Sequence, residues 1–178
     1  MKSIEEIISG EEILWQGIPK KGFQLVMEDL LIIPFIFIFG FVVGTIIIIN
    51  PKPFTYFGFL FYAIGGFAIY RRYITDIISR KKSHYIITSK KVVLNKNGRF
   101  IIFPYERIKT VSFKEHPFSF KYGSVIIGKE QNIFGDNNES FHYPVRGGLN
   151  LKRDEYAIDF ITDYKEVYNL IMLNIKQA

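Results

Sequence analysis

The chain has no cysteine among its 178 residues, which excludes disulfides, thiolate metal sites and cysteine nucleophiles. Charge is missing from two long stretches, because residues 30–49 and residues 54–70 contain no Lys, Arg, Asp or Glu. Charged residues make up 22% of the whole chain, so these stretches differ from the rest in distribution. Two such uncharged runs are typical of segments that lie in a lipid bilayer.

Common motifs of catalysis and cofactor binding are also missing. The sequence contains neither the Gly-x-x-x-x-Gly-Lys-Ser/Thr loop of nucleotide-binding proteins nor the Gly-x-Ser-x-Gly elbow of hydrolases. His84, His116 and His142 are scattered without the spacing of a metal site, and residues 136–139 lack the spacing of a calcium loop. We therefore expect no enzymatic activity, no cofactor and no bound metal.

The first uncharged stretch is long enough to cross a bilayer as a helix. Residues 30–49 would span roughly 30 Å at about 1.5 Å per residue, the thickness of the hydrocarbon core. Two prolines within residues 50–53 then end the helix, because proline cannot continue it. The second stretch, residues 54–70, is shorter and has tyrosines that extend it into the interface. The pattern predicts a transmembrane helical hairpin within residues 30–73, after a cytoplasmic pre-membrane segment, residues 1–29.

The distribution of Lys and Arg predicts the orientation of this hairpin. The turn between the two runs holds only Lys52, whereas Lys20 and Lys21 precede the first run and five basic residues lie within 71–82. Positive charge is retained on the cytoplasmic side of a membrane. We therefore expect a multi-pass protein of the cell inner (cytoplasmic) membrane with both termini in the cytoplasm.

Small residues are expected to bring the two membrane helices together. Gly40 and Gly44 are four residues apart, and folding the hairpin about residues 51–52 places Gly44 level with Gly58 and Gly40 level with Ala63. Close packing of the two helices is the simpler interpretation, and a contact between two copies of the chain is the alternative. Neither run contains an ionisable residue, which argues against an ion pathway.

Beyond residue 82 the sequence changes to short runs of β-branched and aromatic residues. Asn97 and Gly98 lie between two such runs, and this pair is the strongest local signal for a β-hairpin. Closely spaced short strands predict a small antiparallel barrel or sandwich within residues 83–178. The expected strands cover residues 85–89, 91–95, 100–105, 110–115, 123–128 and 156–161.

A C-terminal helix is predicted to close this domain. Asp163 is a candidate N-cap and Glu166 can complete a capping box. Five apolar or aromatic residues then share one helical face, which we expect to pack on the sheet: Tyr164, Val167, Tyr168, Ile171 and Ile175. The polar stretch 129–155 is read as one more strand, at 140–145, with loops, and a dedicated binding loop is the alternative.

Four short motifs follow one another in a characteristic order. Residues 10–19 place acidic residues and a Trp before Gly-Ile-Pro, and residues 85–93 contain Tyr-x-x-Thr-x-x-Lys, with Lys91 where Arg is usual. Residues 105–111 and 121–128 continue the match. This order resembles the bacterial PH-domain membrane proteins. The resemblance implies a membrane setting and a PH-like barrel with a C-terminal helix, but no common ligand and no catalytic residues.

Seven basic residues form the most suggestive polar feature. They are Arg71, Arg72, Arg80, Lys81, Lys82, Lys90 and Lys91. The simpler interpretation is that they hold the hairpin's orientation. The alternative is contact with anionic headgroups at the membrane surface, worth about 1 kcal/mol per basic residue. The net charge is +6, but the Lys and Arg residues form no stripe along the sequence, so we expect no nucleic-acid binding.

These features together predict a membrane-anchored, non-enzymatic PH-like interaction module. Its partners would be the lipid bilayer and either another protein or a second copy of the chain, forming a homo-oligomer. Two alternatives remain open: sensing of an anionic lipid or small ligand by the basic membrane-proximal face, and a role as subunit of a membrane transport complex.

Overall fold

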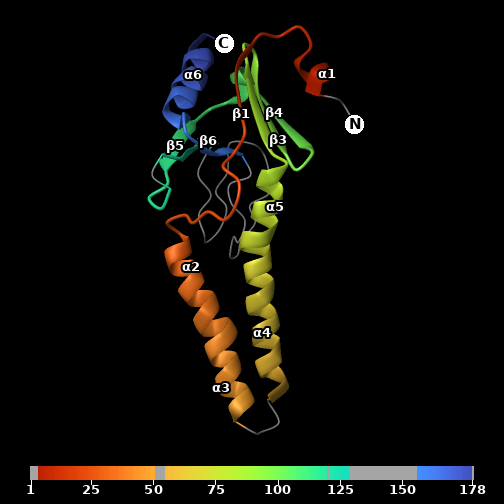
Figure 1. Ribbon diagram of the computed structural model, residues 1–178. Coiled ribbons are helices and arrows are strands. Elements are labelled where there is room, and N and C mark those ends of the chain that lie inside the picture. Colours follow the sequence, from red (N-terminus) through yellow and green to blue (C-terminus); the bar gives the residue numbers. More distant parts are fainter. Residues whose placement is uncertain (1–3, 51–54, 120, 129–155, 178) are drawn as a thin grey trace.

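The computed structural model describes residues 4–50, 55–119, 121–128 and 156–177. These residues form two long helices at one end, and two antiparallel sheets with a C-terminal helix at the other (Figure 1). The strand predicted at 140–145 and the rest of the 129–155 stretch, including His142, lie outside the described residues. The turn predicted at 51–53 also lies outside them.

The two long helices form the narrow end of the molecule. The first runs without a break from Asp29 to Ile49, and the second from Thr55 to Lys81. Each contains one wide π-helical turn between two α-helical parts. In chain order the parts are α2 (Asp29–Ile36), η1 (Phe37–Val42), α3 (Val43–Ile49), α4 (Thr55–Ile69), η2 (Tyr70–Ile74) and α5 (Thr75–Lys81).

Within the described part of the chain, one helix is long and apolar enough to cross a bilayer, and it is Asp29–Ile49. The apolar part of the second helix is too short to cross a bilayer by the same measure. This part, α4, has 15 residues, and Arg71 and Arg72 follow in η2. The sequence predicted two spans, at residues 30–49 and 54–70. The structure provides the required length and composition for the first span alone.

Glycines bring the two helices into close contact. A Cβ atom added to Gly40 would lie 2.8 Å from the Cα of Gly65, and one added to Gly44 would lie 3.1 Å from the Gly58 carbonyl oxygen. The predicted neighbour of Gly40, Ala63, is exposed instead. Helical periodicity explains the difference. Gly65 lies two turns beyond Gly58 on the same face, whereas Ala63 lies between turns and points elsewhere.

The four-stranded sheet contains one strand that the sequence did not predict. Its order is β1 (Ile13–Gly17), β2 (His84–Thr88), β3 (Lys91–Lys96) and β4 (Arg99–Pro104), with antiparallel neighbours. The predicted turn joins β3 to β4 through positive φ angles at Asn97 (55°) and Gly98 (82°). Strand β1 belongs to the segment 1–29 and pairs with β2, so this segment is partly built into the sheet.

A second sheet and the C-terminal helix complete the β-rich part. The elements are a 3₁₀ turn η3 (Tyr105–Arg107), the antiparallel strands β5 (Val111–Glu115), β6 (Gly123–Ile127) and β7 (Ala157–Ile161), and helix α6 (Tyr164–Gln177). Side chains from both sheets and from α6 form one core, in which Val167 and Ile171 are fully buried. The predicted mainly β domain with a C-terminal helix is compatible with this arrangement.

The outer face of the four-stranded sheet is also covered. Helix α1 (Ile4–Ile8) lies there, and Ile8 packs with Ile86 and Val93. Strands β2 and β3 therefore lack the alternation of a half-exposed strand. Their inner side chains join the core, and their outer side chains contact the N-terminal helix.

Polar contacts fix β1 in addition to its strand pairing. The Glu11 carboxylate accepts hydrogen bonds from Lys91 Nζ (2.8 Å) and Thr88 Oγ1 (2.7 Å). The indole N–H of Trp15 donates to the Asp163 carboxylate at the start of α6. Burial raises the pKa of Glu11, but the hydrogen bonds from Lys91 and Thr88 outweigh it and hold the pKa below the usual 4.5.

We expect acid to loosen β1 from the sheet. Because the folded-state pKa of Glu11 is depressed, its contribution is present above pH 4.5 and is lost as the pH falls through the folded-state value. The effect should be about 1 kcal/mol or less, since the pair is near the surface. Fluorescence of Trp15, the only tryptophan, reports the change. The acid step should disappear in Glu11→Gln and persist in Glu12→Gln, and an equal step in both variants contradicts this role.

Candidate functional site

The helix pair and the sheets meet at a junction that contains buried charge. Asp29, the first residue of α2, pairs with Arg72 of η2 at 3.0 Å, and the two side chains are 1% and 4% exposed. The Val26 backbone N–H (2.9 Å) and the Tyr73 hydroxyl (3.2 Å) also donate to the Asp29 carboxylate. This cluster fixes the start of the first helix against the second helix, just beyond the apolar part of α4.

Arg80 of α5 connects three parts of the chain at the same junction. It pairs with Asp76 at 2.8 Å and donates to the backbone carbonyl oxygens of Lys20 (3.0 Å) and Gly22 (2.6 Å). Its guanidinium also lies over the Phe160 ring, 4.9 Å from the centroid. Arg80 is 3% exposed, so it acts as an internal tie between α5, the segment before α2, and β7.

Phe160 has an unusual backbone at this point of contact. Its φ of 49° lies in the left-handed region, which is rare for a large side chain. Its N–H donates to Ser124 Oγ (3.1 Å), its carbonyl accepts from the Lys20 N–H (3.0 Å), and its ring stacks on His116 at 4.0 Å between centroids. These contacts hold the strained residue in place and link β7 to the segment before the first helix.

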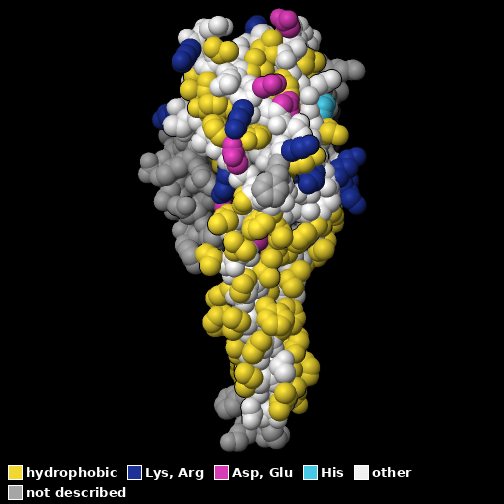
Figure 2. Space-filling model, turned by 60° about the vertical axis from the view of Figure 1, so that its left-hand side comes forward, with side chains coloured by type: hydrophobic (Ala, Val, Ile, Leu, Met, Phe, Trp, Pro, Cys, Tyr) yellow, Lys and Arg dark blue, Asp and Glu magenta, His cyan; other side chains and the backbone are white. Residues whose placement is uncertain are grey.

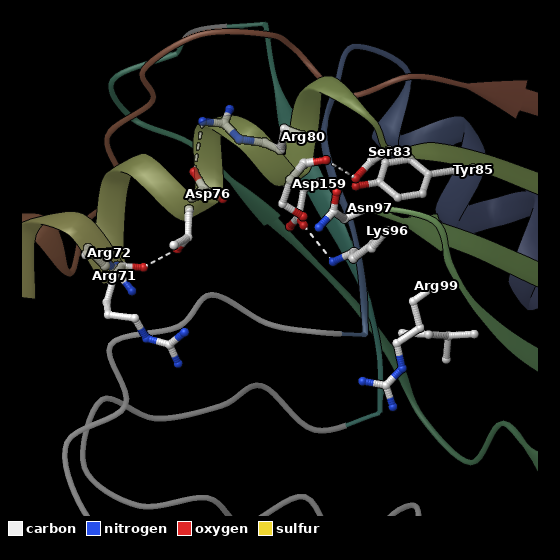
Figure 3. A pocket seen from close by; sticks show the side chains of 13 residues that line it. Arg71, Arg72, Asp76, Arg80, Ser83, Tyr85, Lys96, Asn97, Arg99 and Asp159 are labelled. Atoms are coloured by element: carbon white, nitrogen blue, oxygen red, sulfur yellow. Dashed lines mark hydrogen bonds and ion pairs between the residues drawn. The ribbon is translucent and has the colours of Figure 1, made fainter.

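A cavity of about 350 Å³ lies beside this junction (Figure 3). Its walls come from η2 and α5, from the β3–β4 hairpin, and from β2 and β7. This volume falls within the range of small-ligand sites. Most of the lining residues are polar, and the charged ones are predominantly basic. Its charged members are the basic Arg71, Arg72, Arg80, Lys96 and Arg99, and the acidic Asp76 and Asp159.

Both acidic side chains of the cavity have basic partners. Asp76 pairs with Arg80, and Asp159 pairs with Lys96 at 2.8 Å. Arg72 is paired with Asp29, which lies outside the lining, so Arg71 is the basic side chain of the lining that carries a charge without a described ion-pair partner. Such a cavity suits a ligand that carries negative charge and hydrogen-bond acceptor atoms.

Arg71 and Arg99 stand on opposite walls of the cavity. In Figure 3 the Arg71 side chain comes from η2 and the Arg99 side chain from β4, and both guanidinium groups extend toward the bottom of the view, away from Tyr85. Arg71 is half-buried, and it forms no ion pair with any residue that the structure describes. Its positive charge is therefore not neutralised by a described carboxylate.

Two buried polar atoms belong to residues that line the cavity. The hydroxyl of Tyr85 and the Nε of Arg80 meet the geometry of a hydrogen bond with no residue in the described ranges. Tyr85 is fully buried, and burial, followed by the charge of Asp159, raises its pKa well above the usual 10.0. The Tyr85 hydroxyl therefore stays protonated at neutral pH and can donate.

Five of the seven predicted surface-contact residues lie near this junction, but they differ in accessibility. Arg71 lines the cavity and is half-buried. Arg72 and Arg80 line it too, but both are almost fully buried in ion pairs, so the structure does not present them to a membrane surface. Lys81 and Lys82 are exposed at and just beyond the end of α5, outside the cavity lining.

The other two predicted residues lie elsewhere, and two unpredicted residues take their place. Lys90 and Lys91 follow β2 at its far end, roughly 15 Å from α5 at about 3.3 Å per strand residue, and Lys91 pairs with Glu11. Lys96 and Arg99 line the cavity instead. Strand β3 runs antiparallel to β2, so its last residues return to the end of β2 that follows α5. The two adjacent strands predicted from the sequence could therefore have placed Lys96 and Arg99 near α5.

The histidines do not form a metal site in the described part of the chain. No group of three or more His, Asp or Glu residues there is arranged to hold a metal ion. His84 is half-buried at the start of β2. His116 is buried against Phe160, and its Nε2 lies 2.7 Å from Ser124 Oγ. The position of His116 is therefore explained by its packing on Phe160 and its hydrogen bond with Ser124.

Comparison with known proteins gives one result: no protein-family model, no curated protein and no solved structure matches the chain.

Proposed function

We propose that this chain is a multi-pass protein of the cytoplasmic membrane whose helix pair lies in the bilayer as a hairpin. Both termini and the β-rich domain face the cytoplasm in this proposal. The observation that carries it is the apolar outer surface of both helices. Figure 2 displays this surface as a continuous hydrophobic stem, with Lys, Arg, Asp and Glu gathered toward the wide end.

The individual side chains on that surface support a lipid environment. Large apolar side chains on both helices are exposed, among them Leu31, Phe37, Phe39, Phe57, Phe59 and Phe67. A contiguous apolar surface of this extent is unfavourable in water and favourable in hydrocarbon. Lipid therefore replaces the protein core that would otherwise have to cover these helices.

The contacts between the helices support a hairpin in which both helices share the bilayer. The Gly40–Gly65 and Gly44–Gly58 approaches are the small-residue contacts that membrane helices use. Thr45 Oγ1 also lies 2.7 Å from the Tyr62 hydroxyl, so these two side chains share a hydrogen bond across the pair. The Asp29–Arg72 pair then marks the level at which both helices leave the apolar region.

We further propose that the β-rich domain is PH-like and acts as a binding module without enzymatic activity. The order of the motifs in residues 10–128 and the two sheets around one core closed by α6 support this relation. Its partner would be another protein or a second copy of the chain at the cytoplasmic face. Phe113 and Leu173, exposed on β5 and α6, are apolar contact points that such a partner could cover.

Single cysteines test the membrane topology directly, because the natural chain has none. Lys52→Cys places a thiol in the turn between the two runs, and Lys176→Cys places one at the end of α6. We expect a membrane-impermeant maleimide to label Lys52→Cys in intact cells and Lys176→Cys only after lysis. The protein should stay in the membrane fraction at alkaline pH and be extracted by detergent. Labelling of Lys176→Cys from outside, or release without detergent, would falsify the proposed topology.

In-cell crosslinking followed by mass spectrometry tests the binding role. We expect crosslinks from the β-rich domain to a second protein or to another copy of the chain. Phe113→Ser and Leu173→Ser should weaken those crosslinks, whereas Lys82→Ser, an exposed change outside α6 and β5, serves as the control. A strictly monomeric mass in detergent together with no crosslinked partner contradicts this role.

A further inference from the structure

We propose that the cavity at the junction binds a phosphate-bearing anion, presented by the membrane as the headgroup of an anionic phospholipid. The phosphate site depends on the cavity alone, and its lipid source rests on the membrane setting proposed above. The inference goes beyond a general attraction of basic residues to a membrane, because it assigns one defined site and its donors.

The charge of the cavity favours an anion. Of the five basic side chains in its lining, Arg80 and Lys96 are paired with the two acidic ones, and Arg72 is paired with Asp29. Arg71 has no described ion-pair partner, and it lies half-buried where a charge-assisted hydrogen bond is stronger than in bulk water. A phosphate could accept two parallel hydrogen bonds from this guanidinium.

Two further donors favour a ligand with several acceptor oxygens. The Tyr85 hydroxyl and the Arg80 Nε are buried and meet no described acceptor, although both residues line the cavity. A buried donor without a partner is energetically unfavourable. A ligand oxygen that accepts a hydrogen bond from such a donor therefore adds more binding free energy than one that only replaces a bound water molecule. Phosphate oxygens accept from several directions, whereas the positive choline and ethanolamine groups do not accept at all.

The position of the cavity favours a lipid as the source of the phosphate. Arg71 lies two residues beyond Ile69, where the apolar part of α4 ends. Phe67 and Tyr70 are exposed just before it, and rings of this kind lie at the level of lipid headgroups. A phospholipid whose acyl chains lie along α4 would therefore carry its phosphate at the height of Arg71.

Lipid binding by the purified full-length chain in detergent tests the proposal. Native mass spectrometry would measure retention of phosphatidylglycerol, phosphatidylcholine and inorganic phosphate. We expect tighter retention of phosphatidylglycerol than of phosphatidylcholine, and weaker binding of inorganic phosphate. Arg71→Gln should weaken phosphatidylglycerol binding by about tenfold, the scale of one lost charge-assisted hydrogen bond. Lys81→Gln removes the same charge from an exposed position on α5 and should change binding less than twofold.

A second variant separates ligand binding from folding. Tyr85→Phe removes only a hydroxyl that donates to no described acceptor, so the melting temperature should not fall, while phosphatidylglycerol affinity should fall severalfold. The site is overturned if Arg71→Gln and Lys81→Gln lose phosphatidylglycerol binding equally. It is also overturned if the natural chain retains phosphatidylglycerol and phosphatidylcholine equally. Inorganic phosphate binding as tightly as phosphatidylglycerol, and lost in Arg71→Gln, overturns the lipid source and retains the anion site. The chain could also enter phosphatidylcholine nanodiscs normally and yet show no preference for phosphatidylglycerol. That result would contradict the lipid site and leave the proposed membrane topology unaffected.

Discussion

Replacement of Asp29 by alanine is expected to lower the free energy of unfolding by about 3–5 kcal/mol. The substitution leaves the Arg72 guanidinium buried without its carboxylate, and removal of one member of a buried pair is strongly destabilising. It also removes the acceptor for the Val26 N–H and the Tyr73 hydroxyl. Denaturant titration of the detergent-solubilised chain, followed by the fluorescence of Trp15, measures the change.

The adjacent acidic residue provides a matched control. Glu28 pairs with Lys114, but both side chains of that pair are 27% exposed, so Glu28→Gln should cost about 1 kcal/mol or less. The double variant Asp29→Ala/Arg72→Met should recover part of the loss, because it leaves no uncompensated charge. Equal destabilisation by Asp29→Ala and Glu28→Gln would show that the Asp29 pair does not hold the helices together.

The second large effect is expected at the closest contact between the helices. Gly40→Ala would place a methyl group 2.8 Å from the Cα of Gly65, a distance that forces the backbones apart. Overpacking of this kind destabilises by about 1–3 kcal/mol, and here it also weakens the neighbouring Gly44–Gly58 approach. Unfolding by denaturant in detergent, with helicity followed by circular dichroism, measures the loss.

Gly66 is the control for this substitution. It follows Gly65 in α4, but a Cβ atom at Gly66 would meet no atom within 4 Å. Gly66→Ala should therefore be neutral or stabilise the helix by up to about 1 kcal/mol, because alanine is the better helix former. If Gly40→Ala is as stable as Gly66→Ala, the helices do not depend on this close approach.

The local β structure was largely predictable, because its signals lie within a few residues of each other. Asn97 and Gly98 both adopt positive φ in the predicted turn between β3 and β4. The last helix also begins next to Asp163, as predicted. The role of Asp163 differs, however. Among the described residues its carboxylate accepts from Trp15 and Thr162 rather than from the backbone of Glu166, because β1 brings the indole to the helix start.

Strand β1 and its contacts were beyond local sequence reasoning. Residues 13–17 precede the helix pair by only a short segment, yet they pair with β2, which follows both helices. A strand that pairs across two intervening helices leaves no local turn signal. The predicted neighbour of Gly40 was wrong for a related reason. Counting residues from the turn gave depth along the helix, but only the rotation of α4 decides that Gly65 rather than Ala63 faces the partner helix.

The candidate site was predicted in part, because charge can be read from sequence and burial cannot. Arg71 was named among seven basic residues, but nothing local distinguishes it from Arg72, which is buried against Asp29. Tyr85 was expected only as a strand residue, and its hydroxyl gains importance from the cavity that β2 and η2 enclose together. Sites assembled from separate elements require the three-dimensional structure.

The continuity of the second helix has a mechanical consequence. It extends about 40 Å from Thr55 to Lys81 without a loop, and His84 opens β2 almost immediately afterwards. No loop therefore allows the domain to rotate freely relative to the helix pair. The Arg80 hydrogen bonds and ion pair further fix α5 to the segment before α2. In the proposed membrane setting, a change in bilayer thickness that tilts the helix pair would tilt the domain with it. A spectroscopic probe on the domain would then report the tilt of the helices in the proposed bilayer.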